Sequence, residues 1–128
     1  MNDYAPVELL VCTTCRRGQE LPDTEERPGA LLHRALAAGE LPEGVTLFGV
    51  ECFSNCDHGC SIALRGGSRR WTYVYGNLDP SSADVVLDGV ARYRATSDGL
   101  VPWRERPEHF RKNCIARIPP IEPPEAAK

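Results

Sequence analysis

The sequence has no long apolar run near its N-terminus, where the segment from residue 7 to residue 11 is interrupted by Glu8. A membrane-spanning helix needs about 20 consecutive apolar residues, and a signal peptide starts with basic residues before its apolar core. Because this segment has neither property, we expect no membrane partner and a cytoplasmic location.

An excess of basic residues is also missing. The chain has 15 Lys and Arg against 18 Asp and Glu, which gives a formal net charge of −3 at pH 7. Domains that bind nucleic acids usually cluster Lys and Arg on one face. Here only Arg65, Arg69 and Arg70 form a small basic group, so we expect no nucleic-acid partner.

Cysteine, in contrast, is well represented, with six residues in a chain of 128. Disulfides are rare in a reducing cytoplasm, so six cysteines there favour metal binding or redox chemistry over a disulfide framework. The length fits one domain with a hydrophobic core of its own.

The apolar patterning predicts strands and helices in a definite order. Four short segments rich in apolar, β-branched or aromatic residues are predicted strands: 7–11, 45–50, 61–65 and 71–75. Apolar residues at helical spacing predict a helix over residues 28–38 and a second one that opens within residues 79–84, where Ser81 and Asp84 form a weak capping-box pattern. Val86, Val90 and Tyr93 form the buried face of this second helix. The resulting order is βαβ followed by ββα.

This order predicts an α/β fold, a thioredoxin-like sandwich with a mixed four-stranded sheet. The strand–helix–strand unit implies a parallel pair with a right-handed crossover, and Gly66-Gly67 marks the turn of an antiparallel hairpin. We expect residues 1–95 to form this domain. Residues 96–128 should be an irregular extension packed on it through Trp103, Phe110 and Cys114, with a mobile Pro-rich tail.

Five of the six cysteines are expected to meet at one edge of this sheet. Cys12 and Cys15 follow the first predicted strand, and Cys52, Cys56 and Cys60 follow the second. Since the two strands are predicted to be parallel, their carboxyl ends lie at the same edge, where open α/β sheets usually bind ligands. Four thiolates gathered there can hold either a [2Fe–2S] cluster or a structural zinc ion.

The spacing of these cysteines resembles that of the thioredoxin-like [2Fe–2S] ferredoxins. Cys12-x₂-Cys15, then 36 residues, then Cys52-x₃-Cys56-Asp57 is similar to their pattern, over roughly residues 6–95. The family includes the small iron–sulfur subunit of respiratory complex I. The resemblance implies a [2Fe–2S] cluster held by Cys12, Cys15, Cys52 and Cys56, and a homodimer.

The whole chain, including the ending VPWRERPEHFRKNCIARIPP, also resembles a family of small, uncharacterised predicted metal-binding proteins. These are often encoded near cobalamin-biosynthesis genes, which implies a role in that pathway. The sequence departs from the ferredoxin pattern in its short Cys12–Cys15 spacing and in having Cys60 where relatives tend to have proline. Cys60 is therefore an alternative fourth ligand to Cys15.

Two other functions remain open at this point. A zinc ion on the same cysteines would make the chain a zinc-stabilised interaction module. Alternatively, Cys12 and Cys15 could form the redox pair of a thiol–disulfide oxidoreductase. Against the latter, a loop of about a dozen residues follows Cys15 before the predicted helix, whereas the redox pair of thioredoxin opens directly onto a helix.

We therefore expect a one-electron carrier that is not an enzyme by itself and that serves an unidentified redox partner protein. With four cysteine ligands the reduction potential should lie near about −400 mV. Cys114 stands alone in the sequence and is expected to be a buried packing residue.

Overall fold

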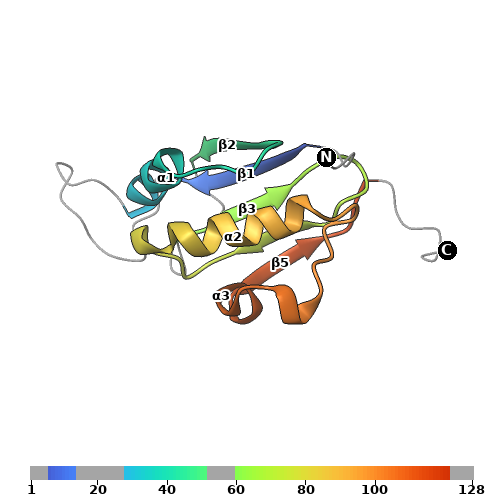
Figure 1. The fold of residues 1–128 in the computed structure, drawn as a ribbon. Helices are drawn as coiled ribbons and strands as arrows, with labels where there is room; N and C mark the ends of the chain where they lie inside the picture. The colour runs from blue at the N-terminus through green and yellow to red at the C-terminus, as the bar shows by residue number, and fades with distance from the viewer. Residues whose placement is uncertain (1–5, 14–27, 52–59, 122–128) are drawn as a thin grey trace.

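The computed structural model of the chain describes residues 6–13, 28–51 and 60–121 (Figure 1). Its strands are β1 (Val7–Cys12), β2 (Val45–Val50), β3 (Ile62–Arg65), β4 (Thr72–Tyr75) and β5 (Cys114–Ile118), and its α-helices are α1 (Pro28–Ala38), α2 (Ala83–Arg94) and α3 (Glu108–Lys112). Among these residues, no helix combines the length and the apolar character needed to cross a bilayer.

The strands form one mixed sheet in the order β2-β1-β3-β4-β5. β1 and β2 are parallel and are connected through α1, whereas β3, β4 and β5 each pair antiparallel with their neighbours. The predicted α/β class and the βαβ–ββα order are confirmed. The predicted number of four strands was wrong, because β5 adds a fifth strand beside β4.

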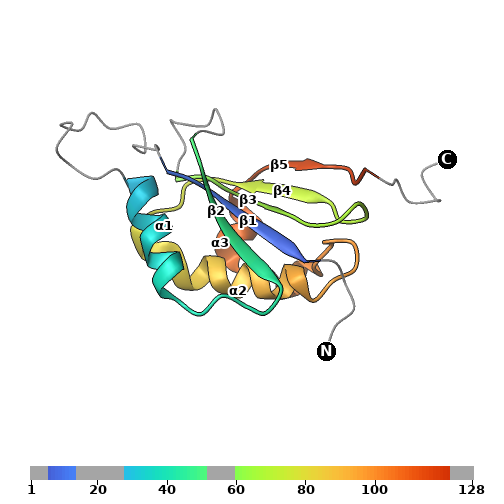
Figure 2. The ribbon, with the colours of Figure 1, turned by 90° about the horizontal axis from the view of Figure 1, so that it is seen from above.

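The core lies between one face of the sheet and the helices. Val7, Leu9 and Val11 of β1 are fully buried, as expected for alternate residues of a strand that face the helical layer. Figure 2 shows α1 and α2 on this side of the sheet and no helix on the other. No described helix covers the opposite face, although Leu10 and Ala63, which alternate with the core residues of their strands, are only 7% and 3% exposed.

The two predicted helices bury the residues that their periodicity indicates. α2 buries Val86, Val90 and Tyr93, as predicted, and α1 buries Leu32 and Leu36. A 3₁₀ turn over Pro80–Ser82 precedes α2. Asp79 caps this turn by accepting a hydrogen bond from the backbone N–H of Ser81 at 2.8 Å, which satisfies one of the donors that a helix start leaves unpaired.

The C-terminal segment is ordered into α3 and β5, so its prediction as an irregular extension was wrong. Phe110 of α3 is buried as expected, with its ring stacked on Tyr75 at a centroid distance of 4.0 Å. Trp103 is 58% exposed and Cys114 is also exposed, contrary to the predicted packing. Arg106 covers one face of the Trp103 ring at 5.5 Å, so this indole contacts a cation at the surface.

The connection between β3 and β4 is longer than the two-residue turn indicated by Gly66-Gly67. It carries Arg70, which is 2% exposed and reaches the C-terminal end of α2. Its guanidinium donates to the carbonyl oxygens of Arg94 and Thr96 at 3.1 and 3.0 Å. The longer loop thus ties the hairpin to the helix.

The expected division near residue 95 and the expected mobility of the tail both stay predictions. Pro120 is buried, and residues 122–128 lie outside the described part of the chain.

Candidate metal centre

The carboxyl ends of β1 and β2 lie level with each other, as the parallel pairing predicts. Cys12, the last residue of β1, pairs in register with Val50, the last residue of β2. Thr13 extends the pairing, because its backbone N–H and its hydroxyl both donate to the carbonyl oxygen of Val50, at 2.8 and 3.1 Å. The backbone positions at this edge are therefore fixed by hydrogen bonds as far as Thr13 after β1 and Val50 at the end of β2.

The thiol of Cys12 points across this edge to the end of β2. Cys12 is 3% exposed, and its Sγ donates to the carbonyl oxygen of Glu51 at 3.3 Å. Glu51 is the residue directly before Cys52 in the sequence. The first predicted ligand thus lies against the chain segment that leads into the second predicted cysteine group.

A third chain segment, at the entrance to β3, reaches the same edge. The backbone N–H of Cys12 donates to the carbonyl oxygen of Ser61 at 3.0 Å, and Cys60 exchanges two backbone hydrogen bonds with Leu78, at 2.8 and 3.1 Å. Cys60 is fully buried and belongs to the same hydrophobic cluster as Cys12. Its burial is equally typical of a packing thiol, so its role as an alternative fourth ligand is not decided by its position.

The remaining predicted ligands, Cys15, Cys52 and Cys56, lie outside the described residues. Within residues 6–13, 28–51 and 60–121, no group of three or more His, Cys, Asp or Glu side chains is placed to hold a metal ion. The described part of the site still fits thiolate ligation, because the Cys12 sulfur lies at the end of a paired strand and contacts the carbonyl of Glu51, the residue before Cys52 in the sequence. The assignment of the four ligands stays a prediction.

Gly49 of β2 and His33 of α1 also lie at this edge, and neither was identified from the sequence as part of the site. A side chain at Gly49 of β2 would place its Cβ 2.8 Å from Cγ2 of Thr13 and 3.5 Å from the ring of His33. The absence of a side chain therefore lets Thr13 approach the strand next to Cys12, whereas the distance to His33 is an ordinary van der Waals contact. A glycine inside a strand often marks such a close approach, so the sequence did contain a signal for Gly49. Nothing in the sequence pointed to His33.

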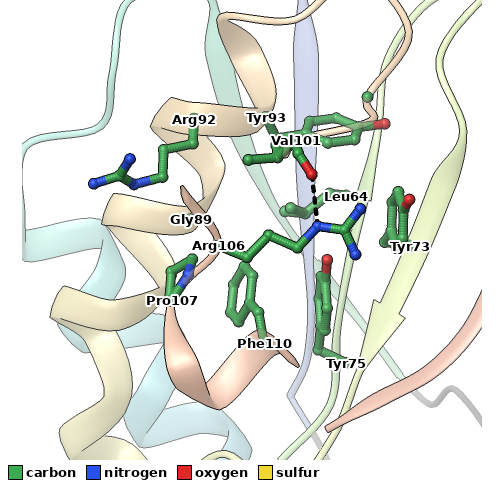
Figure 3. Close-up of a pocket in the computed structure, with 11 residues that line it drawn as sticks. Leu64, Tyr73, Tyr75, Gly89, Arg92, Tyr93, Val101, Arg106, Pro107 and Phe110 are labelled. Atoms are coloured by element: carbon green, nitrogen blue, oxygen red, sulfur yellow. Dashed lines mark hydrogen bonds between the residues drawn. The ribbon is translucent and has the colours of Figure 1, made fainter. Parts of the chain in front are cut away.

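A separate pocket lies between the sheet and the helices α2 and α3, and Figure 3 shows Arg106 reaching into it. Arg106 donates through Nε to the carbonyl oxygen of Val101 at 2.7 Å. Burial raises the pKa of Tyr75 and of Tyr93 above the ordinary value, so both phenols stay protonated at neutral pH. The described lining residues include no Cys, His or carboxylate, so this pocket is not the expected metal centre.

Two solved structures share this architecture. A thioredoxin-like [2Fe–2S] ferredoxin from Aquifex aeolicus is similar with a TM-score of 0.53 and 13% identity, over 91% of this chain and 96% of the other. A crystal structure of the wild-type thioredoxin-like [2Fe–2S] ferredoxin from the same organism is similar with a TM-score of 0.52 and 12% identity, over 88% and 98% of the two chains. The predicted thioredoxin-like fold is thereby confirmed.

At such low identity the likeness concerns the fold alone. A comparison with curated protein sequences finds no match. The model of one protein family, described as "Protein of unknown function (DUF1636)", matches residues 9–120, which is most of the chain. The chain belongs to the DUF1636 family.

Proposed function

We propose that this chain holds a [2Fe–2S] cluster through Cys12, Cys15, Cys52 and Cys56 and that it carries single electrons to or from a partner protein. The observation that carries the proposal is the position of Cys12. Its sulfur lies at the carboxyl end of β1 and contacts the carbonyl of Glu51, the residue before Cys52. The fold shared with thioredoxin-like [2Fe–2S] ferredoxins supports the same proposal.

The described residues have clear tasks in this proposal. The strand pairing of β1 with β2 fixes the direction of the Cys12 side chain before any metal is bound, so little conformational entropy remains to be lost there. When bound, a cluster with cysteine ligands accepts and releases one electron at a potential set by its charge, solvent exposure and hydrogen bonds. With four such ligands we propose a potential near about −400 mV.

The backbone N–H groups at the end of β1 cannot supply the hydrogen bonds that a cluster's ligand sulfurs accept. The backbone N–H groups of Cys12 and Thr13 are already donated to Ser61 and Val50, so they do not point at a cluster. Donors that stabilise a negatively charged cluster would therefore lie in the two cysteine loops, where the sequence provides Gly18, Ser54 and Asn55.

The physiological partner is a redox protein that the proposal leaves unidentified. A role in cobalamin biosynthesis rests on the family resemblance alone. The same cysteines could instead bind zinc, and a thiol–disulfide exchange at Cys12 and Cys15 is the third alternative. For the third, the sequence predicts a loop of about a dozen residues between Cys15 and the helix predicted over residues 28–38, whereas a helix N-terminus directly after the pair is what would lower its thiol pKa.

Substitution of single cysteines tests the proposal. Cys12→Ala should remove or severely deplete the visible absorption of the cluster and its low-temperature EPR signal after dithionite reduction, because one iron loses a protein ligand. Cys60→Ala is a matched control, since it deletes an equally buried thiol from the same hydrophobic cluster but should keep the chromophore. Cys114→Ala, at an exposed position on β5, should leave the spectrum unchanged.

The fourth ligand is decided by comparing Cys15→Ala with Cys60→Ala. We expect loss of the cluster in the first variant and a retained cluster with a shifted potential in the second. The reverse result would assign the fourth ligand to Cys60. A wild-type spectrum in all variants of Cys12, Cys15, Cys52, Cys56 and Cys60 would refute the proposed site.

A further inference from the structure

The hydroxyl group of Tyr73 is buried without a hydrogen-bond partner. Tyr73 is 2% exposed, and none of the described residues forms a hydrogen bond with its Oη. It lines the pocket between the sheet, α2 and α3 (Figure 3). Tyr93 lines the same pocket, but its hydroxyl donates to the carbonyl oxygen of Trp71 at 2.5 Å. Since buried tyrosine hydroxyls usually have a partner, the Tyr73 hydroxyl marks this pocket as a candidate ligand site.

The guanidinium of Arg106 is a second group in this pocket with unused donors. Its Nε donates to the carbonyl oxygen of Val101 at 2.7 Å, but its two Nη atoms have no acceptor among the described residues. No described carboxylate forms an ion pair with it either. The ring centroids of Tyr73 and Trp103 lie 5.6 and 5.5 Å from its Cζ. Two aromatic contacts therefore position a charge that no described acidic side chain compensates.

The charges and hydrogen-bonding groups of the pocket favour an anion. The hydroxyl of Tyr75 points toward the Arg106 guanidinium (Figure 3), and because burial raises the pKa of Tyr75, this hydroxyl keeps its proton at neutral pH. A guanidinium can only donate hydrogen bonds, and phenolic hydroxyls can donate as well as accept. With no carboxylate among the described lining residues, the pocket disfavours a cation and favours a hydrogen-bond acceptor of negative charge, since charges interact strongly where water is scarce.

The size of the pocket limits this anion to a single atom. The cavity has a volume of about 10 Å³, which is about what one water-sized occupant needs. Sulfate, phosphate and organic carboxylates consist of several heavy atoms and are too large for it. A halide ion is close to a water molecule in size. In contrast to water, it accepts hydrogen bonds from all surrounding donors and has no protons of its own to place.

We propose that this pocket is a chloride-binding site in which one ion accepts hydrogen bonds from the hydroxyl of Tyr73 and from the Nη groups of Arg106. Tyr73 belongs to β4 and Arg106 lies shortly before α3, so the ion joins the sheet to the segment that leads into α3. Its charge compensates that of the guanidinium. No described cysteine lines the pocket, and the site is therefore independent of the proposed [2Fe–2S] cluster.

Replacement of chloride by bromide locates the ion directly. Crystals of the full chain, as purified, are grown with sodium bromide in place of sodium chloride, and diffraction is measured at the bromine absorption edge. We expect an anomalous difference peak within hydrogen-bond reach of Oη of Tyr73 and of the Nη atoms of Arg106. Density without an anomalous signal would show that a water molecule fills the pocket, and this result would overturn the proposal.

The line width of the chloride NMR signal measures binding in solution, with glutamate as the replacement anion at constant ionic strength. Bound chloride relaxes faster than free chloride, so the wild-type protein should give an excess line width that saturates as the chloride concentration rises. Tyr73→Phe keeps the ring and removes only the hydroxyl, and it should weaken binding by about tenfold or more. Tyr93→Phe is the matched control, since it deletes a hydroxyl that already donates to Trp71, and it should leave the affinity unchanged.

A second pair of variants tests the contribution of the guanidinium charge. Arg106→Gln should abolish the saturable binding. Arg92→Gln removes another guanidinium that lines the pocket but is paired with Asp88 at 3.1 Å, so it should retain the binding. Unchanged affinity in either Tyr73→Phe or Arg106→Gln would overturn the proposal. A bromide peak in the crystal without saturable binding in solution would also overturn it, because the ion would then bind at crystal concentration only.

Discussion

Substitution of Gly89 by alanine should destabilise this protein, although the same change stabilises most helices. Gly89 lies inside α2, where alanine is normally favoured over glycine by about 1 kcal/mol. Here a Cβ atom would lie 2.1 Å from Cε2 and 2.6 Å from Cζ of Phe110. Carbon atoms in contact are normally about 3.5–4.0 Å apart, so the ring must move by more than about 1 Å.

The structure indicates how much this displacement costs. Phe110 is 3% exposed and stacks on Tyr75 at 4.0 Å, and such aromatic pairs contribute about 0.5–1.5 kcal/mol beyond their buried area. Overpacking of a filled core costs typically about 1–3 kcal/mol. After the helical gain of about 1 kcal/mol is subtracted, the overpacking and the lost ring stacking together should lower the free energy of unfolding by about 0.5–3.5 kcal/mol.

Chemical denaturation and a double-mutant cycle measure this effect. In a Phe110→Ala background the clash is absent, so Gly89→Ala should become neutral or stabilising by up to about 1 kcal/mol. Ala91→Gly, at an exposed position of the same helix, calibrates the helical term and should destabilise by about 1 kcal/mol. Stabilisation by Gly89→Ala in the wild-type background would refute the described packing of α3 on α2.

Three further expectations concern the loop between β3 and β4, the carboxyl ends of β1 and β2, and β5. Arg70→Met should lower the free energy of unfolding by about 2–3 kcal/mol in denaturant titrations, because two carbonyls at the end of α2 lose a buried, charged donor; a loss below about 0.5 kcal/mol would contradict this role. Gly49→Ala should shift the reduction potential or lower the iron content, since its Cβ would displace Thr13 beside Cys12. Melting curves show whether the substitution disturbs the site alone or destabilises the whole fold. An unchanged potential and iron content would show that Thr13 adjusts freely. Although Cys114 is an exposed residue, partial desolvation of its thiol raises the pKa of this group. Its alkylation by iodoacetamide should therefore reach half its maximal rate above the usual pH of about 8.5, with Cys114→Ser as the blank, and a midpoint below that pH would contradict the described surroundings of this thiol.

The sequence predicted the part of the fold that local patterns determine. β1, β2 and α2 follow from short apolar runs and from the helical spacing of Val86, Val90 and Tyr93, and these features do not depend on distant contacts. The parallel pairing of β1 with β2 then followed from the rule for strand–helix–strand connections.

β5 was missed because its strand structure depends on a distant partner. The segment is only five residues long, it ends directly before Pro119, and it pairs with β4 some 40 residues earlier in the chain. The exposure of Trp103 was also not predictable, since an aromatic residue is usually taken as core, whereas here the indole is at the surface with Arg106 over its ring.

At the candidate metal centre, the order of strands and helices predicted the position of Cys12. That Cys12 lies at the carboxyl end of a strand beside the end of β2 follows from element order, and the structure confirms this position. The contact of the thiol with the carbonyl of Glu51 and the approach of Thr13 and His33 around Gly49 depend on atomic packing. No periodicity or spacing in the sequence encodes such contacts.

Metal analysis of the full chain purified without oxygen decides whether the cysteines hold a [2Fe–2S] cluster. Iron, acid-labile sulfide and zinc are measured in the same sample, and the protein concentration is taken from amino-acid analysis. We expect about two irons and two sulfides per chain and little zinc. About one zinc per chain, with no iron–sulfur chromophore even after anaerobic reconstitution, would contradict it.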